Sequence, residues 1–148
     1  MAFEIEHKYL VDNDSYKEMA TGKLEIRQGY LNRNPDRTVR VRTMGSKGFL
    51  TVKSRNHGDK RLEFEYEIPD HDAIEMLKLA EPGIVEKTRY IIPYGNLIWE
   101  VDEFHGSLKG VVVAEVEIPE TDTIYEKPPF IGVDITGNPA YYNSNLKL

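Results

Sequence analysis

The 148-residue chain contains no cysteine and no apolar run near the 18 residues that a membrane-spanning helix needs. The missing cysteines exclude disulfides, thiolate catalysis and cysteine-ligated zinc, and they fit a reducing cytoplasm. The N-terminus lacks a basic stretch followed by an apolar core, so we expect neither a secretory signal nor a membrane partner. The net charge of −6 disfavours a nucleic acid duplex as ligand. We therefore expect one cytoplasmic domain over residues 1–148.

Most of the chain alternates apolar and polar residues with a period of two, which is typical of strands. Helices are expected at residues 12–20, capped by Asp12 or Asn13, and at 71–80, with Ile74, Met76 and Leu77 apolar; a helical turn is expected at the end of the tail. Strands are expected at residues 3–9, 26–31, 38–44, 48–55, 61–68, 85–93, 97–104 and 110–118. This pattern predicts a mainly β, α+β protein built as an antiparallel barrel or sandwich.

Charged residues occupy one face of nearly every predicted strand. In the first strand Glu4, Glu6 and Lys8 share a face, because side chains two apart point the same way. Two such carboxylates lie roughly 6.5–7 Å apart and repel by about 2.4 kcal/mol at an effective dielectric near 20. The pattern recurs in Arg40 and Arg42, in Lys53 and Arg55, in Arg61, Glu63, Glu65 and Glu67, in Lys87 and Arg89, in Glu100 and Asp102, and in Glu115 and Glu117.

A sheet with one face in water would explain charge on any single strand. Here the signs separate by strand, acidic on the first, seventh and eighth and basic on the third, fourth and sixth. This separation favours charged faces turned inward around a water-filled bore. Arginine and lysine match a polyanion with several oxygens, whereas carboxylates are compatible with phosphate if Mg²⁺ or Mn²⁺ lies between. The sequence thus predicts a site for a divalent metal and an oligophosphate.

Glu4-Ile5-Glu6-His7-Lys8 forms an E-x-E-x-K signature, followed in order by TVRVR, TVKS, RLEFEYEI, EKTRY, WEVDEF, VAEVEI and YYNSNL. The whole chain thereby resembles the CYTH superfamily, also called triphosphate tunnel metalloenzymes. The resemblance implies a closed eight-stranded antiparallel β-barrel with a few short outer helices. It also implies metal-dependent action on triphosphates, which in this family includes inorganic triphosphatase, thiamine triphosphatase, nucleotide or RNA triphosphatase and class IV adenylate cyclase activity.

The same resemblance implies roles for individual residues. Glu4, Glu6, Glu115 and Glu117 match metal-binding positions. Asp102 is a further metal candidate, and Glu100 and Asp102 could instead order metal-bound water or neutralise the phosphate-binding cations. Lys8 matches a phosphate-contacting and catalytic lysine. Glu63 and Glu65 match the pair that serves a second metal or the attacking water, although Glu67 has the same parity. The phosphate-binding positions are matched by Lys8, Arg40, Arg42, Lys53, Arg55, Arg61, Lys87 and Arg89.

Three hypotheses follow for the function. The first is metal-dependent hydrolysis of a small triphosphate, above all inorganic tripolyphosphate. The second is a class IV adenylate cyclase, which would need an adenine pocket that the sequence does not reveal. The third is a polyphosphate-binding module without catalysis. The apolar outer strand faces also suggest a homodimer.

Other residues are predicted to be structural. His7 has outward parity and should not affect the site. Residues 45–48 form a hairpin turn without the spacing of a P-loop. We expect His57, His71 and His105 on the surface and Tyr9, Tyr30, Phe64, Tyr66 and Tyr90 in the outer layer.

Overall fold

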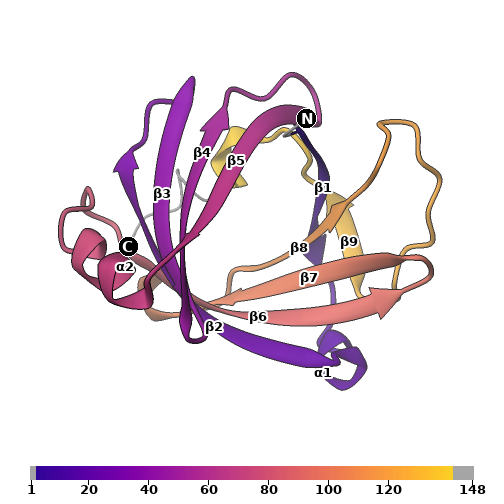
Figure 1. Cartoon of the computed structure of the whole chain (residues 1–148). Helices are drawn as coiled ribbons and strands as arrows, with labels where there is room; N and C mark the ends of the chain where they lie inside the picture. The colour runs from indigo at the N-terminus through magenta and orange to yellow at the C-terminus, as the bar shows by residue number, and fades with distance from the viewer. Residues whose placement is uncertain (1–2, 142–148) are drawn as a thin grey trace.

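Nine strands form one antiparallel sheet in a computed structural model that describes residues 3–141 (Figure 1). Their spatial order is β5-β4-β3-β2-β6-β7-β8-β1-β9, and β1 also pairs with β5. That additional pairing closes β1 to β8 into the predicted eight-stranded barrel and leaves β9 outside it. The strands are β1 (Phe3–Val11), β2 (Gly22–Asn32), β3 (Arg37–Met44), β4 (Lys47–Ser54), β5 (Lys60–Ile68), β6 (Val85–Tyr94), β7 (Leu97–Phe104), β8 (Val112–Glu117) and β9 (Ile131–Asp134).

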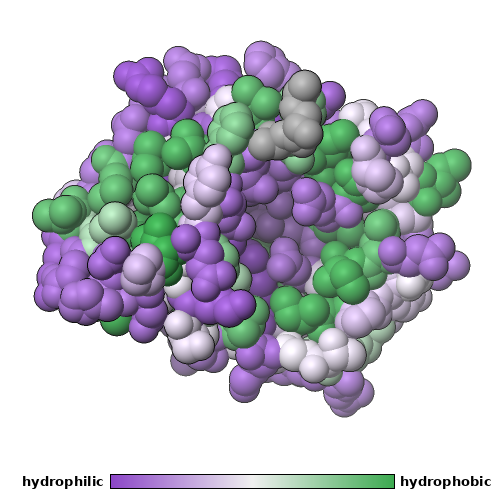
Figure 2. Space-filling view, in the orientation of Figure 1, coloured by the Kyte–Doolittle hydropathy of each residue, from purple (hydrophilic) through white to green (hydrophobic). Residues whose placement is uncertain are grey.

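The barrel interior divides into a charged half and an apolar half. The half near the start of β1 opens to solvent as a hollow lined by hydrophilic residues (Figure 2). Toward the far end, Val85, Phe104 and Val113 have the same strand parity as the charged residues, are at most 3% exposed, and pack with Ile135 and Leu10. The prediction of an inward-facing charged surface is confirmed for the open half. The far half is closed by these apolar side chains, at inward positions that the charge pattern does not include.

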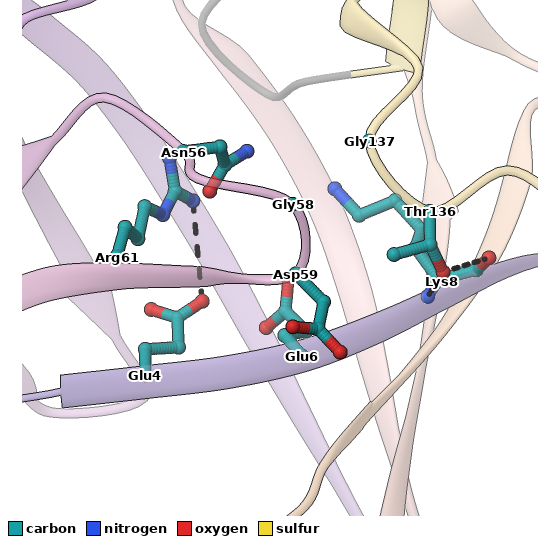
Figure 3. A pocket seen from close by; sticks show the side chains of 9 residues that line it. All are labelled: Glu4, Glu6, Lys8, Asn56, Gly58, Asp59, Arg61, Thr136 and Gly137. Atoms are coloured by element: carbon teal, nitrogen blue, oxygen red, sulfur yellow. Dashed lines mark hydrogen bonds and ion pairs between the residues drawn. The ribbon is translucent and has the colours of Figure 1, made fainter. Parts of the chain in front are cut away.

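The barrel closes at a seam, by which we mean the junction of β1 with β5 and with the β4–β5 loop. Among the described residues, three pairs join the two strands there: Phe3 with Leu62, Glu4 with Arg61, and Ile5 with Lys60. Farther along β1, Tyr9 and Val11 pair with β9 instead. The part of β1 between these pairings faces a small polar pocket (Figure 3).

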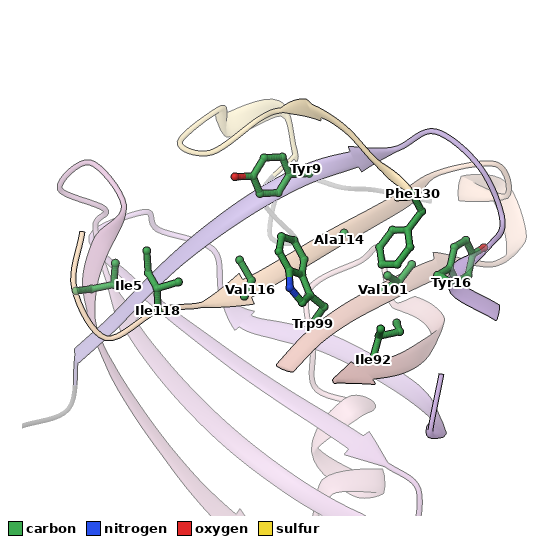
Figure 4. Packing of buried hydrophobic residues seen from close by; sticks show 10 residues of the cluster. All are labelled: Ile5, Tyr9, Tyr16, Ile92, Trp99, Val101, Ala114, Val116, Ile118 and Phe130. Carbon is green, nitrogen blue, oxygen red and sulfur yellow. The ribbon is translucent and has the colours of Figure 1, made fainter. Parts of the chain in front are cut away.

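Apolar side chains form an outer layer on the barrel wall. Trp99, Tyr9, Val116 and Phe130 belong to a buried cluster that covers β1, β6, β7 and β8 (Figure 4). The short helix α1 (Tyr16–Met19) also belongs to this outer layer. It begins after Ser15 rather than at the predicted cap residue Asp12 or Asn13. Asn13 instead accepts a hydrogen bond from the Ser15 N–H.

The second helix, α2 (Asp70–Leu77), covers the outside of β3 and β4. Gly48 permits this close approach, because a Cβ atom there would lie 2.7 Å from the Ala73 Cβ. Ala73 and Leu77 are buried, but Ile74 is exposed, so its predicted place in the apolar face is wrong.

The outer face of β5 is less covered than expected. Phe64 is 41% and Tyr66 is 64% exposed, whereas Tyr9 and Tyr30 are buried as predicted. Two short 3₁₀ helices, η1 (Gly106–Leu108) and η2 (Pro139–Tyr141), complete the fold. The rest of the predicted tail, including most of YYNSNL, lies outside the described residues. No helix within residues 3–141 is long and apolar enough to cross a membrane.

Candidate active site

The open half of the barrel holds a cavity of about 260 Å³. Every residue that lines it except Met44 carries an ionisable side chain. The others are Glu4, Glu6, Lys8, Arg40, Arg42, Lys53, Arg61, Glu63, Glu65, Arg89, Glu100, Glu115 and Glu117. Strand alternation therefore brings twelve of the fifteen predicted site residues, together with Glu100, to one cavity.

The basic wall of the cavity centres on Arg40 and Arg42 of β3, each only 6% exposed. Glu65 lies 3.0 Å from the Arg42 Nη2 and 3.5 Å from the Arg40 Nη2. Burial and the neighbouring cations Arg40 and Arg89 lower the pKa of Arg42 to about 10. One carboxylate shared by two buried guanidinium groups leaves positive charge that an anionic ligand would stabilise.

Arg89 is held from beneath by a buried carboxylate. Its Nε and Nη2 donate to the two oxygens of Asp102 at 2.8 and 2.9 Å, and Lys87 Nζ lies 2.7 Å from the same carboxylate. Burial raises the pKa of Asp102, but Arg89 and Lys87 outweigh it and lower this pKa to about 2. Burial lowers the pKa of Lys87 to about 8. Asp102 thus fixes the orientation of Arg89.

The acidic wall comes from β1 and β8, where Glu6 is opposite Glu117 and Lys8 is opposite Glu115. Lys8 Nζ lies 3.3 Å from Glu115, and burial is outweighed by Lys8 and Arg89, so the pKa of Glu115 is lowered. Lys53 Nζ lies 2.8 Å from Glu4, and its charge lowers the pKa of Glu4 in spite of burial. Two of the four carboxylates are therefore compensated by lysines.

Glu6 and Glu117 behave differently from these two. Burial and the negative charges of Glu115 and Glu4 raise the pKa of Glu6 well above its usual value. Burial and the charges of Glu4 and Glu100 raise the pKa of Glu117. A cation bound beside these two residues would offset the neighbouring negative charges and favour the ionised carboxylates.

Glu63 and Glu65 also have different surroundings. Glu65 accepts a hydrogen bond from Thr51 Oγ1 at 2.7 Å and one from Arg42 at 3.0 Å, and despite burial these partners lower its pKa. Glu63 lies 3.2 Å from Lys53 Nζ, and burial together with Glu4 raises the pKa of Glu63 to about 7. Glu63 is the better placed of the two to accept a proton.

A second, smaller pocket of about 30 Å³ lies at the seam and shares Glu4, Glu6, Lys8 and Arg61 with the main cavity. Its other lining residues come from the β4–β5 loop and the segment after β9: Asn56, Gly58, Asp59, Thr136 and Gly137 (Figure 3). This volume suits one or two water molecules.

Comparison with known proteins places this arrangement in a family. Residues 2–140 match the CYTH domain. The chain belongs to the CYTH family. It is 48% identical to an inorganic triphosphatase of Acetivibrio thermocellus over 99% of this chain and 94% of that protein.

Two solved structures agree with the fold. The crystal structure of an inorganic triphosphatase is 31% identical, with a TM-score of 0.68, covering all of this chain and 96% of the other. A Pyrococcus horikoshii protein is 23% identical, with a TM-score of 0.64 over 80% of each chain, and supports the fold alone.

Membership of the CYTH family implies a divalent metal cofactor. The residues fit such an ion, because carboxylate oxygens suit hard divalent cations and a cation would offset the neighbouring carboxylates that raise the pKa of Glu6 and of Glu117. Among residues 3–141, no three acidic or histidine side chains already converge as a closed metal cluster. A site that uses few carboxylates and leaves room for water and phosphate oxygens is typical of Mg²⁺.

Three predicted site residues do not line the cavity. Arg55 follows the end of β4, so strand parity no longer sets its direction, and it pairs with Asp36. Lys87 and Asp102 lie outside the cavity lining, where Asp102 neutralises Lys87 and Arg89, so the structure does not bring Asp102 to the acidic wall. Glu67, the alternative partner to Glu63, is also absent from the lining.

The sequence reasoning missed two groups that hold site residues. Thr51 is buried and its hydroxyl donates a hydrogen bond to Glu65. Its place two residues before Lys53 on the same strand could have predicted that it faces the site. The Tyr141 carbonyl oxygen accepts a hydrogen bond from Lys8 Nζ at 3.3 Å. No local pattern could have predicted that contact, because the two residues lie 133 positions apart.

Proposed function

We propose that this protein hydrolyses inorganic tripolyphosphate to orthophosphate and pyrophosphate with Mg²⁺ or Mn²⁺. The observation that carries the proposal is the single cavity in which a basic wall faces an acidic wall. The 48% identical relative is named for the same activity and supports it. An inorganic substrate is favoured because the described residues that line the cavity include no aromatic ring on which a base could stack.

Substrate binding falls to the basic wall. Arg40, Arg42 and Arg89 present guanidinium groups, which can bind two phosphate oxygens at once, and their buried positions strengthen each contact. Lys8, Lys53 and Arg61 supply further positive charge from the seam side of the cavity. Together these groups would align the phosphate chain and stabilise charge on the transferring phosphoryl group.

The acidic wall would hold the metal through Glu4, Glu6, Glu115 and Glu117. When bound, a divalent ion supplies charge neutralisation between these carboxylates and the phosphate oxygens. Glu63 then acts as the base that accepts a proton from the attacking water. The water oxygen forms a bond to the terminal phosphorus, and the bridging P–O bond breaks with its electrons on the pyrophosphate that leaves.

The test is a turnover panel of tripolyphosphate, ATP, GTP and thiamine triphosphate with Mg²⁺ and with Mn²⁺. We include organic triphosphates because a groove at the open end, lined partly by Phe3, Leu97 and Ile98, is the surface that an organic group would meet. Tripolyphosphate should be cleaved with the highest kcat/KM. Efficient cyclic AMP formation from ATP with intact tripolyphosphate would indicate a cyclase, and tight binding without turnover would indicate a binding module.

A further inference from the structure

His7 lies between two site residues but points away from them. On β1, Glu6 and Lys8 face the cavity, and His7 faces the outer layer, where its ring lies 5.7 Å from the Tyr125 ring. Its Nδ1 lies 2.6 Å from the Tyr125 hydroxyl, and its Nε2 lies 2.8 Å from Asp59 Oδ2. A half-buried histidine with both ring nitrogens engaged is fixed in position.

Asp59 holds β1 at two successive residues. Its backbone carbonyl oxygen accepts a hydrogen bond from the Glu6 N–H at 3.0 Å, and its side chain accepts one from His7. The other carboxylate oxygen accepts a hydrogen bond from Thr121 Oγ1 at 3.0 Å. Asp59 therefore connects β1, the β4–β5 loop and the segment after β8 at a single point.

Tyr125 holds the other side of the histidine. Its hydroxyl bonds to His7 Nδ1 and also to the Tyr9 hydroxyl, so the segment after β8 contacts two outward residues of β1. The contacts lie just past the three β1–β5 residue pairs, where the ladder between these strands has ended. Without them, the middle of β1 would be held at this edge mainly by isolated backbone contacts.

We infer that His7, Asp59 and Tyr125 form a positioning clamp that fixes the cavity-facing Glu6 and Lys8. Adjacent strand residues share a backbone, so a movement of His7 displaces the carboxylate on one side and the ammonium on the other. Because Asp59 also lines the seam pocket, the clamp fixes the wall beside Glu6. His7 is a positioning residue, since it touches neither substrate nor metal. The inference rests on the proposed role of Glu6 in metal binding.

The experiment measures Mn²⁺ affinity of the full-length protein by calorimetry or electron paramagnetic resonance, together with KM and kcat for tripolyphosphate. His7→Phe removes both hydrogen bonds and should weaken Mn²⁺ binding by about 10-fold, the low end for residues that orient metal ligands. His7→Arg retains a donor for Asp59 and should recover most of the affinity. Tyr125→Phe, which keeps the ring, provides a second variant should His7→Phe fail to fold.

Tyr16→Phe is the matched control. It removes another hydrogen bond from a buried outer-layer tyrosine to a carboxylate, Glu103, far along the barrel wall from the seam. Both substitutions should lower the melting temperature, but only those in the clamp should change Mn²⁺ affinity.

Three results overturn the inference. If His7→Phe and Tyr125→Phe bind Mn²⁺ like the unaltered protein, or if Tyr16→Phe loses as much affinity, the clamp has no positioning role, and the proposed function stands. If the unaltered protein neither binds Mn²⁺ nor cleaves tripolyphosphate, the proposed function fails, and the clamp fails with it.

Discussion

Glu6 and Glu117 lie directly opposite each other on β1 and β8, and the pKa of each is raised by burial and by neighbouring carboxylates. Folding thus places each carboxylate where other carboxylates oppose its ionisation, Glu115 and Glu4 for Glu6 and Glu4 and Glu100 for Glu117. Such an arrangement lowers the stability of the metal-free protein and strengthens its attraction for a divalent ion.

Glu6→Gln should therefore have opposite effects on stability and on metal binding. The melting temperature of the metal-free protein at neutral pH should rise, because a carboxyl group whose pKa is raised by folding destabilises the folded state and glutamine does not ionise. The metal concentration for half-maximal activity should rise by about 10-fold or more, because a ligand is weakened. Calorimetric unfolding without metal and activity titrations with Mg²⁺ check both effects. A variant less stable than the parent would contradict this account of the pair.

Arg42→Ala should raise the KM for tripolyphosphate by about 10-fold or more, as expected when a hydrogen bond to a charged group is lost. Arg42 is buried in the basic wall and is partly uncompensated there. Arg27→Ala serves as the control, because Arg27 pairs with Glu86 and half of its side chain is exposed. Steady-state kinetics should give different KM values for the two variants. Equal KM values would show that Arg42 does not contribute to substrate binding.

Glu63→Gln and Glu65→Gln should change different kinetic constants. Glu63→Gln should lower kcat by about 100-fold or more, the usual contribution of a general base. Glu65→Gln should act mainly on KM, because Arg40, Arg42 and Thr51 lose the carboxylate that orients them. Rates at saturating substrate separate the two effects. A normal kcat in Glu63→Gln would show that another group acts as the general base.

Asp102→Asn should destabilise the fold in a pH-dependent manner. The pKa of Asp102 is lowered from 3.8 to about 2 in the folded state, so its charge stabilises the protein above about pH 4. That stabilisation is lost as the pH falls toward 2, and the difference between parent and variant should shrink over this range. At neutral pH the loss should be about 3–5 kcal/mol, because Lys87 and Arg89 lose their partner. Denaturant unfolding measures it, with the exposed Glu75→Gln as control.

Strand parity accounts for most of what the sequence could predict. Alternation alone puts Glu4, Arg42 and Glu115 on inward faces, and the closed sheet then brings them to one cavity. The same rule fails where a strand ends, as at Arg55, and it cannot distinguish a residue at the cavity surface from one beneath it, as at Asp102.

Long-range contacts account for the rest. Strand β9 is short and follows two prolines, so its segment has no strong strand pattern, and it is ordered by pairing with β1. Strand parity correctly predicts that His7 faces outward, but the direction of a side chain does not show which other segments it contacts. Its contacts with Asp59 and Tyr125 join positions 52 and 118 residues away, which no local pattern shows.

The apolar far half of the barrel limits how anions enter and leave the cavity. Val85, Phe104 and Val113 close the way behind Lys87, and the seam pocket of about 30 Å³ is too small for a phosphate group. Within the described residues, the substrate and both products therefore enter and leave through a single opening, the open end of the barrel. Pyrophosphate must leave through this opening before the next tripolyphosphate can bind. Free pyrophosphate should therefore inhibit the enzyme competitively.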